Sequence, residues 1–538
     1  MLIYKEMGLV KKLFNNGKIY TMNHSEDTYV GVIVNDATIE RLLTQDDLNE
    51  INIKDFEVID LNEGTMFPGF VETHIHVLGT GVWLSSVILN GETNIEVVKD
   101  KIKQKAEQLE PGEWLVAEGY DENLLHGIRL DKNDLDELCK DNPVIIKRVC
   151  RHAAIVNTKA LKKLDVKDDV DNPVGGSYEK QDGVLTGWIY DTAMEPFEEL
   201  ASNEDEQSLT KHLQNAIDYL YQFGITGSHT EDLGYYEDYK DVLNAYKTVV
   251  GGEDHQRPFR VRLLRHFSVY EQMMDEQATF VDGWLEPDAM KFYADGAFGG
   301  STALLKEPYS NDPAGENYGL SIYTQEELNE KVQLARKYNG AIAVHMIGDK
   351  ACEMVLDAIE KYPAPKELRD RLIHISTLNE ELLKRVSKLP VICDVQPQFI
   401  TSDFPWVQDK VGDQRARYLY PFKSMLDLNI IIGGGSDAPI ETPNPMLGVH
   451  AAVNRQSYGE NGAYFIEEAI SIFDAMSLYT TQASEIAQTT DRTGKIKPGY
   501  EADFTVLDKD PFETDPKELA NIQAIKTIVN GKIVYERE

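Results

Sequence analysis

The sequence of 538 residues predicts an α/β fold: a TIM-type (β/α)8 barrel, a small β-sandwich domain formed from both termini, and a subdomain inserted after the first barrel strand. Three observations lead to this prediction. Eight short apolar runs alternate with helical stretches, both chain ends have β-type sequence, and about 150 residues separate the first two apolar runs. We therefore expect a composite domain over 1–65 plus 488–538 and a barrel over 66–487, with an insert over 84–205.

The two chain ends share short β-branched or alternating runs with Asn, Asp and Gly between them. Leu13–Tyr20 and Val30–Ile39 have this character near the start, and Asp503–Leu507 near the end. Ile525–Tyr535 contains an Asn-Gly pair, which predicts a β-hairpin. We expect the two ends to pair in one domain.

The middle of the chain supplies the barrel strands. Their expected ranges are 66–73, 224–230, 260–266, 289–294, 341–346, 372–376, 391–396 and 430–436. The stretch between the first two is longer than one crossover helix requires, which predicts the inserted subdomain.

Composition narrows the class of protein. Lys and Arg number 54 against 91 Asp and Glu, and this formal charge of -37 would repel nucleic acid and anionic membranes. The four cysteines form no C-x-x-C pair, and no apolar segment reaches membrane-spanning length. We expect a cytoplasmic protein with buried thiols and a small-molecule substrate, and a homodimer stays open as its assembly.

Two histidines end the first predicted barrel strand. His74 and His76 lie two residues apart, so their side chains should point to the same face of the strand and into the barrel mouth. An isolated H-x-H is also found by chance on solvated strands. Three further strand ends carry related groups, His345, His374 and Asp437, and imidazole with carboxylate suits zinc and similar ions. This convergence predicts a metal centre.

Several segments then resemble a known family. The most specific are Lys291–Ala297, His345–Asp349, Gln396–Phe399 and Gly435–Pro439. The chain resembles the amidohydrolase superfamily, and within it amidohydrolase family 3, the branch similar to the N-substituted formamide deformylase type of metal-dependent hydrolase. The matching segments run from Asn16 to Phe512.

The resemblance implies a ligand set and its chemistry. His74, His76, His345, His374 and Asp437 would hold one or two divalent ions, with zinc expected, and Lys291 would bridge them as a carboxylated lysine. A buried neutral lysine can form such a carbamate, whereas an ammonium ion cannot coordinate a metal. The alternative for Lys291 is a structural ion pair with a carboxylate such as Asp295. Asp437 would act as general base toward metal-activated water, unless it only caps the following turn.

Other residues are weaker site candidates. His229, near the end of the second barrel strand, is a second catalytic candidate, or it packs behind the site. In the insert, His152, Tyr120, Asp121 and Trp188 are candidates to line the substrate cavity, although aromatic residues there also suit the insert's own core.

One position departs from the family pattern, which has an acidic residue before the sixth-strand histidine. Here that residue is Ile373. Because strand neighbours face opposite ways, we expect the change to affect packing outside the barrel or a contact behind the site, and to leave coordination intact.

The sequence thus predicts hydrolysis of a non-peptide carbon–nitrogen bond, an amide or formamide, in a small molecule. An esterase or lactonase on the same metal site is one alternative, because fold and metal do not set the scissile bond. A non-catalytic metal-binding protein on the same scaffold is the other.

Overall fold

The chain divides into two compact units, which are described separately. One is Gly81–His212, and the other combines Met1–Thr80 with Leu213–Glu538. A computed structural model describes residues 11–148, 153–173, 175–201, 205–236, 238–252, 255–457 and 462–537. Over these residues the strands form three sheets, one in the insert and two in the larger unit.

The barrel sheet contains eight parallel strands in the order β19-β18-β17-β16-β15-β14-β13-β6. Their bounds are β6 Phe70–Ile75, β13 Ile225–Glu231, β14 Arg260–His266, β15 Leu285–Tyr293, β16 Ile342–Met346, β17 Asp370–His374, β18 Val391–Val395 and β19 Ile432–Gly434. All eight predicted strands are present. The edge strands β19 and β6 lie against each other, and the backbone N–H of Asp437 donates to the carbonyl of His74 at 3.0 Å. This bond joins the two edges at the end where the predicted site residues lie.

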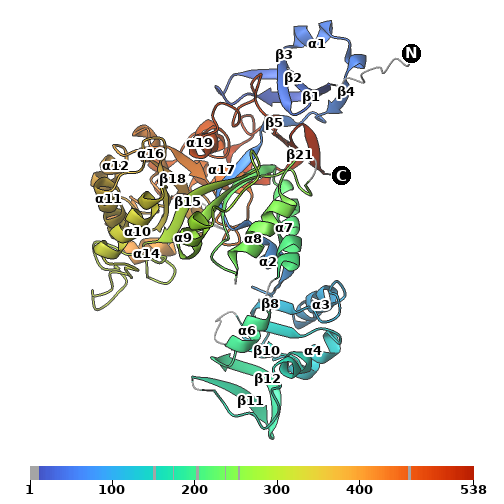
Figure 1. The fold of residues 1–538 in the computed structure, drawn as a ribbon, viewed down its shortest axis with the longest axis vertical. Coiled ribbons are helices and arrows are strands. Elements are labelled where there is room, and N and C mark those ends of the chain that lie inside the picture. Colours follow the sequence, from blue (N-terminus) through green and yellow to red (C-terminus); the bar gives the residue numbers. More distant parts are fainter. Residues whose placement is uncertain are drawn as a thin grey trace. The chain divides into compact units, whose positions relative to one another are not determined.

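Helices cover the outside of the barrel, as Figure 1 shows for α9 to α12 beside β15 and β18. The helices between and after the strands are α7 Glu206–Tyr221, α8 Tyr239–Val249, α9 Phe267–Asp275, α10 Gln325–Lys337, α11 Asp349–Lys361, α12 Glu380–Val386, α13 Phe399–Asp403, α14 Trp406–Val411, α15 Asp413–Ala416, α16 Phe422–Asp427, α17 Pro445–Asn454, α18 Ile472–Ser477 and α19 Thr481–Ala487, with a short η2 at Ile466–Glu468. Thr324 and Glu327 form a capping box that starts α10. On α11, Cys352, Val355 and Ile359 are buried at helical spacing, which turns one face of the helix toward the sheet.

The first barrel strand begins later than predicted. Met66 and Phe67 belong to β5 (Thr65–Pro68), which pairs antiparallel with β20 (Phe504–Leu507) in the terminal sheet. Gly69 separates β5 from β6, and a Cβ there would lie 2.3 Å from the Thr226 hydroxyl oxygen. A single apolar run therefore supplies two sheets, which hydropathy alone does not reveal.

Both chain ends form the terminal sheet, where blue and red strands lie side by side in Figure 1. Besides β5 and β20 it contains β1 Lys12–Tyr20, β2 Thr28–Asn35, β3 Thr38–Leu43, β4 Glu57–Asp60, β21 Ala524–Val529 and β22 Lys532–Glu536, with α1 Gln45–Glu50, η1 Ile53–Asp55 and η3 Pro516–Asn521 between them. The described strands of this domain share hydrogen bonds in one continuous sheet, and the expected sandwich packing stays a prediction. An irregularity between Asn15 and Ile19 lets β1 pair with β4 along one half and β5 along the other, which keeps the sheet continuous.

The insert has its own sheet, in the order β11-β12-β10-β9-β8-β7. Its elements are β7 Val87–Ile88, β8 Leu115–Tyr120, β9 Val144–Arg148, β10 Ala153–Val156, β11 Gly176–Gln181 and β12 Val184–Asp191, with α3 Ile95–Ala106, α4 Lys132–Leu138, α5 Thr158–Lys163 and α6 Glu195–Ala201; α2 (Val77–Ser85) precedes them. Successive residues of β9 enter different apolar clusters, Ile146 one and Ile145 the other. Both faces of this sheet are therefore covered.

Two expectations from composition can be compared with the described residues. Among them, no helix combines the length and apolar character that crossing a bilayer requires. Cys139, Cys352 and Cys393 are buried free thiols, whereas Cys150 lies outside the described residues.

Candidate metal centre

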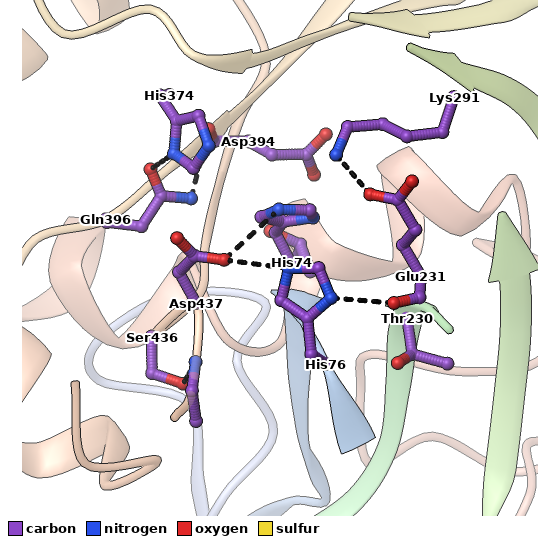
Figure 2. A network of polar contacts seen from close by, with 12 residues as sticks. His74, His76, Thr230, Glu231, Lys291, His374, Asp394, Gln396, Ser436 and Asp437 are labelled. Atoms are coloured by element: carbon purple, nitrogen blue, oxygen red, sulfur yellow. Dashed lines mark hydrogen bonds and ion pairs between the residues drawn. The ribbon is translucent and has the colours of Figure 1, made fainter. Parts of the chain in front are cut away.

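Side chains from separate strands converge at the carboxyl end of the barrel (Figure 2). His74 on β6, His374 at the end of β17 and Asp437 after β19 each offer a ligand atom, and these atoms all lie within 4.8 Å of one another. The Nε2 atoms of His74 and His76 are each 3.4 Å from Oδ1 of Asp437. The rings of His345 and His374 have centroids 4.5 Å apart. Among the described residues, His74, His374 and Asp437 thus form one group of potential ligands, and His76 and His345 border this group.

Backbone geometry explains why these side chains meet. Strand alternation turns His74 and His76 to the same face of β6. His374 and Asp437 have positive φ angles of 70° and 57°, values that non-glycine residues seldom adopt. Both residues therefore leave the regular strand path as they reach the centre.

Three of the histidines are each held in place by a contact of one of their two ring nitrogens. Nδ1 of His76 lies 2.7 Å from the carbonyl oxygen of Glu231, and Nδ1 of His374 lies 2.7 Å from Oε1 of Gln396. Nε2 of His345 lies 3.0 Å from the carbonyl oxygen of Gly296. Histidines that bind metals generally donate their second ring N–H to such an acceptor, which fixes the ring and leaves the other nitrogen free.

Lys291 is fully buried on β15, and its ammonium group forms a close ion pair with Glu231 (Figure 2). Glu231 also accepts a hydrogen bond from the Tyr293 hydroxyl at 3.2 Å. The alternative expected for Lys291, an ion pair with a carboxylate, is thus present with Glu231 as the partner. Asp295, the carboxylate given as the example, instead accepts backbone N–H groups from Leu304, Ile347 and Gly348. Asp295 lies beyond the strand end, where it organises loops and does not face the lysine.

Burial dominates the charge state of the imidazoles. It lowers the pKa of His74 and His345 well below the ordinary value, and the nearby positive charge of Lys291 acts in the same direction. Burial also lowers the pKa of His374. These three rings are neutral at pH 7, the form that coordinates metals.

His76 and Asp437 form a charged pair. Burial opposes the cationic form of His76, but its contact with Asp437 outweighs burial and raises its pKa to about 9. Burial likewise opposes ionisation of Asp437, yet His76 and the neighbouring cations lower its pKa. A bound cation would compete with the His76 proton, because metal binding releases protons from ligands.

The donor set suits a divalent ion. Neutral imidazoles combined with a carboxylate form a set that zinc and similar metals prefer. Oε1 of Glu231, whose other carboxylate oxygen pairs with Lys291, is buried and has no hydrogen-bond partner among the described residues. Since buried polar atoms are normally satisfied, an additional bound species is consistent with this atom.

Comparison with known proteins agrees with this arrangement. The model of the amidohydrolase family matches residues 57–535. This chain belongs to the amidohydrolase family. It is a hydrolase of the metal-dependent amidohydrolase superfamily, as the sequence resemblance predicted.

Relatives of this amidohydrolase match it over nearly its whole length. YtcJ of Bacillus subtilis (strain 168), whose name assigns it to the amidohydrolases, is 38% identical over 534 residues, which cover 98% of this chain and 100% of that protein. N-substituted formamide deformylase of Arthrobacter pascens is 24% identical over 554 residues, covering 97% and 98%. The crystal structure of an uncharacterized metal-dependent hydrolase from Pyrococcus furiosus is 26% identical with a TM-score of 0.76, covering 94% of this chain and 100% of that chain.

Ile373 of this amidohydrolase corrects one expectation from strand alternation. It is buried with Leu264, Ala289 and Ala343, and the two alanines precede Lys291 and His345 by two residues on the same strand faces. Ile373 therefore points into the barrel, and the prediction of an effect on outer packing is wrong. The positive φ of His374 interrupts the alternation, so neighbouring residues both turn inward.

His229 lies apart from the converging histidines. It is buried one strand repeat before Glu231, and the charges acting on it are those of Arg371, Asp288 and Arg262. Burial lowers its pKa well below the ordinary value. A catalytic role for His229 stays a prediction.

Glu231, the last residue of β13, reaches the centre through its contact with Lys291, and sequence reasoning passed over it. An acidic residue at the end of the second strand, two residues after His229 and on the same face, was the signal that could have identified it.

The insert candidates make contacts within their own unit. The Tyr120 hydroxyl donates to the Ile128 carbonyl at 2.9 Å, and Trp188 Nε1 donates to the Leu130 carbonyl at 2.9 Å; both rings join a buried apolar cluster. Asp121 accepts the backbone N–H of Asn123 at 3.0 Å. His152 lies outside the described residues. Substrate contact by these four residues stays a prediction.

Proposed function

We propose that this amidohydrolase cleaves a non-peptide carbon–nitrogen bond, an amide or formamide, of a small molecule. The observation that carries the proposal is the meeting of His74, His374 and Asp437 within 4.8 Å at the mouth of the barrel. In barrel enzymes of this type, catalytic groups come from the carboxyl ends of several strands.

The residues that would hold one or two divalent ions, with zinc as the proposed metal, are His74, His76, Lys291, His345, His374 and Asp437. A divalent cation at such a site acts as a Lewis acid that polarises a carbonyl and lowers the pKa of water. Burial keeps three of the imidazoles neutral and therefore available as donors. Carboxylation of Lys291 is part of the proposal, and would replace its ion pair with Glu231 by a carbamate.

Asp437 is the proposed general base. Its carboxylate is buried, ionised and 3.4 Å from two imidazole nitrogens, so it is held next to the donor atoms. It would take a proton from the attacking water onto a carboxylate oxygen and pass that proton to the leaving nitrogen. An amine leaves readily only after protonation, so this transfer suits a carbon–nitrogen bond.

The choice of bond has support from the relatives. One of them is named N-substituted formamide deformylase and matches 97% of this chain, although at 24% identity. Fold and metal donors do not by themselves distinguish an amide from an ester, so substrate chemistry must decide.

The test uses the purified chain loaded with zinc and matched substrates that share one acyl or amine group: an amide, a formamide, an ester and a lactone. We expect turnover of the amide or formamide, and elemental analysis should find one or two ions per chain. Turnover of the ester or the lactone alone would show that the enzyme is an esterase or lactonase and that the proposed carbon–nitrogen bond is wrong. Bound metal without any turnover across the panel would favour the non-catalytic alternative.

A further inference from the structure

We propose that Arg371 is a positioning residue that aligns the strand ends carrying the metal donors. The inference rests on the proposed metal centre. Arg371 lies on β17, three residues before His374, and its side chain is 1% exposed. A permanently charged group buried so deeply must be fully paired, and its partners indicate what it does.

The guanidinium group joins four barrel strands. Nε and Nη2 donate to the two carboxylate oxygens of Asp394 on β18, at 3.1 and 2.8 Å. Nη1 donates to Asp288 on β15 at 2.5 Å, and Nη2 also donates to the carbonyl oxygen of Thr73 on β6 at 2.8 Å. With its own strand, one side chain therefore contacts β6, β15, β17 and β18.

Each residue that Arg371 contacts lies close in sequence to a predicted metal donor or to a residue that holds such a donor in place. Thr73 directly precedes His74, and Asp288 lies three residues before Lys291. Asp394 lies two residues before Gln396, which holds the ring of His374 (Figure 2). The arginine thus links β17, which carries His374, to β6, which carries His74 and His76, through a bond made one residue before His74.

The positive charge of Arg371 is compensated by neighbouring carboxylates. Asp394 and Asp288 flank the guanidinium group, and Nε of Arg262 lies 3.4 Å from Asp288. Such a buried network holds its shape only while every member is paired. Lysine could keep the charge, but its single ammonium group cannot reproduce the planar fork that reaches Asp394, Asp288 and Thr73 together.

The experiment compares this arginine with another arginine that pairs with the same strand. Arg336 of α10 donates to Asp370 of β17 at 2.6 Å and is 13% exposed, and Asp370 directly precedes Arg371 in sequence. Arg371→Lys and Asp394→Asn break the network beneath the centre. Arg336→Lys and Asp370→Asn are the matched controls, which disturb an arginine–aspartate pair between α10 and the same strand β17.

The measurements are Zn²⁺ affinity, by competition with a chromophoric chelator, the visible absorption spectrum of the Co²⁺-loaded proteins, and the melting temperature without metal. We expect Arg371→Lys and Asp394→Asn to weaken Zn²⁺ binding about 10- to 100-fold, the range for residues that orient metal ligands, and to alter the Co²⁺ spectrum. The two controls should lower the melting temperature to a similar degree with unchanged affinity and spectrum.

Two results would overturn the inference: unchanged Zn²⁺ affinity in both network variants, or an equal loss of affinity in network variants and controls. Should Arg371→Lys not fold, Asp394→Asn decides alone. If the unmodified chain binds no Zn²⁺, the proposed metal centre itself is wrong. This outcome differs from one in which the unmodified chain binds Zn²⁺ normally and the Arg371 and Asp394 variants bind it equally well.

Discussion

Side chains at the barrel mouth are constrained from two directions, by the strand that carries them and by a hydrogen bond to one of their atoms. His76 and His374 each have Nδ1 anchored, which aims Nε2 toward the centre. Within the described part of the chain, the carboxylate of Asp437 has contacts with the imidazoles of His74 and His76 and no other such anchor. Substitutions of ligands and of the base should therefore separate binding from turnover.

Replacing Asp437 by asparagine should leave metal bound and remove most turnover. The amide keeps the shape and one coordinating oxygen but cannot accept a proton at neutral pH. A lost general base typically lowers kcat about 10²- to 10⁴-fold. Steady-state kinetics beside elemental analysis test this, and unchanged kcat would remove Asp437 as the base.

His74→Ala should lower metal content. Its imidazole supplies one of the three converging donor atoms, so its loss should weaken affinity more than the about 10- to 100-fold expected for a residue that orients a ligand. His24→Ala, at an exposed histidine near the terminal sheet, is the control and should retain the ion. Full occupancy of His74→Ala after dialysis would show that the ligand assignment is wrong.

Asp403 should make stability depend on pH. Burial raises its pKa to about 6, although the Tyr420 hydroxyl donates to it. The folded state then holds the proton more tightly than the unfolded chain, so the carboxylate destabilises the fold increasingly from pH 4 to pH 6, by up to about 3 kcal/mol. In Asp403→Asn this cost is absent.

The melting temperature of Asp403→Asn relative to the unmodified chain should consequently rise between about pH 4.5 and pH 7 and then level off. A difference in melting temperature between the two proteins that stays constant over this pH range would contradict the raised pKa of Asp403.

At the scale of elements, glycines mark the points where the barrel meets the terminal sheet. Gly224, just before β13, has φ of 79°, and a Cβ there would lie 2.1 Å from Cγ2 of Thr505 on β20. The Thr505 hydroxyl also donates to the Gly224 carbonyl. The close approach of the two strands therefore depends on the missing side chain.

Gly224→Ala should be more destabilising than Gly499→Ala. Gly499 has a similar φ of 87°, but a Cβ added there would have no atom within 4 Å, so alanine incurs only the backbone cost of about 1–2 kcal/mol. Overpacking against Thr505 should add about 1–3 kcal/mol at Gly224. Thermal unfolding of both variants measures the difference, and equal melting temperatures would mean that the strands move apart at no cost.

At the scale of the whole molecule, the proposed ion should contribute to stability, because its proposed donors come from β6, β15, β16, β17 and the segment after β19. A ligand bound only by the folded state stabilises it by about 2.7 kcal/mol at a hundredfold excess over Kd. Chelation should lower the melting temperature and zinc should restore it. His74→Ala provides the control, since its melting temperature should not respond to chelator; an equal response would place the stabilising ion elsewhere.

Much of this architecture can be predicted from sequence because periodicity and strand-end chemistry are local. The eight apolar runs predicted the barrel strands, and the spacing of His74 and His76 predicted a shared face. The resemblance of motifs such as His345–Asp349 predicted the family, and the family match confirms it. Local signals failed where one run served two sheets, as at Met66 and Phe67 on β5.

By itself, the sequence determined the fold class, the family and the residue types available at the barrel mouth. Only the tertiary structure decided which of them meet: Glu231 rather than Asp295 pairs with Lys291, Ile373 turns inward, and Arg371 joins four strands. The physical reason is that these contacts join residues far apart in the chain and depend on backbone turns such as the positive φ of His374. Pairing in a buried, low-dielectric interior is set by distance in space, which neither composition nor spacing encodes.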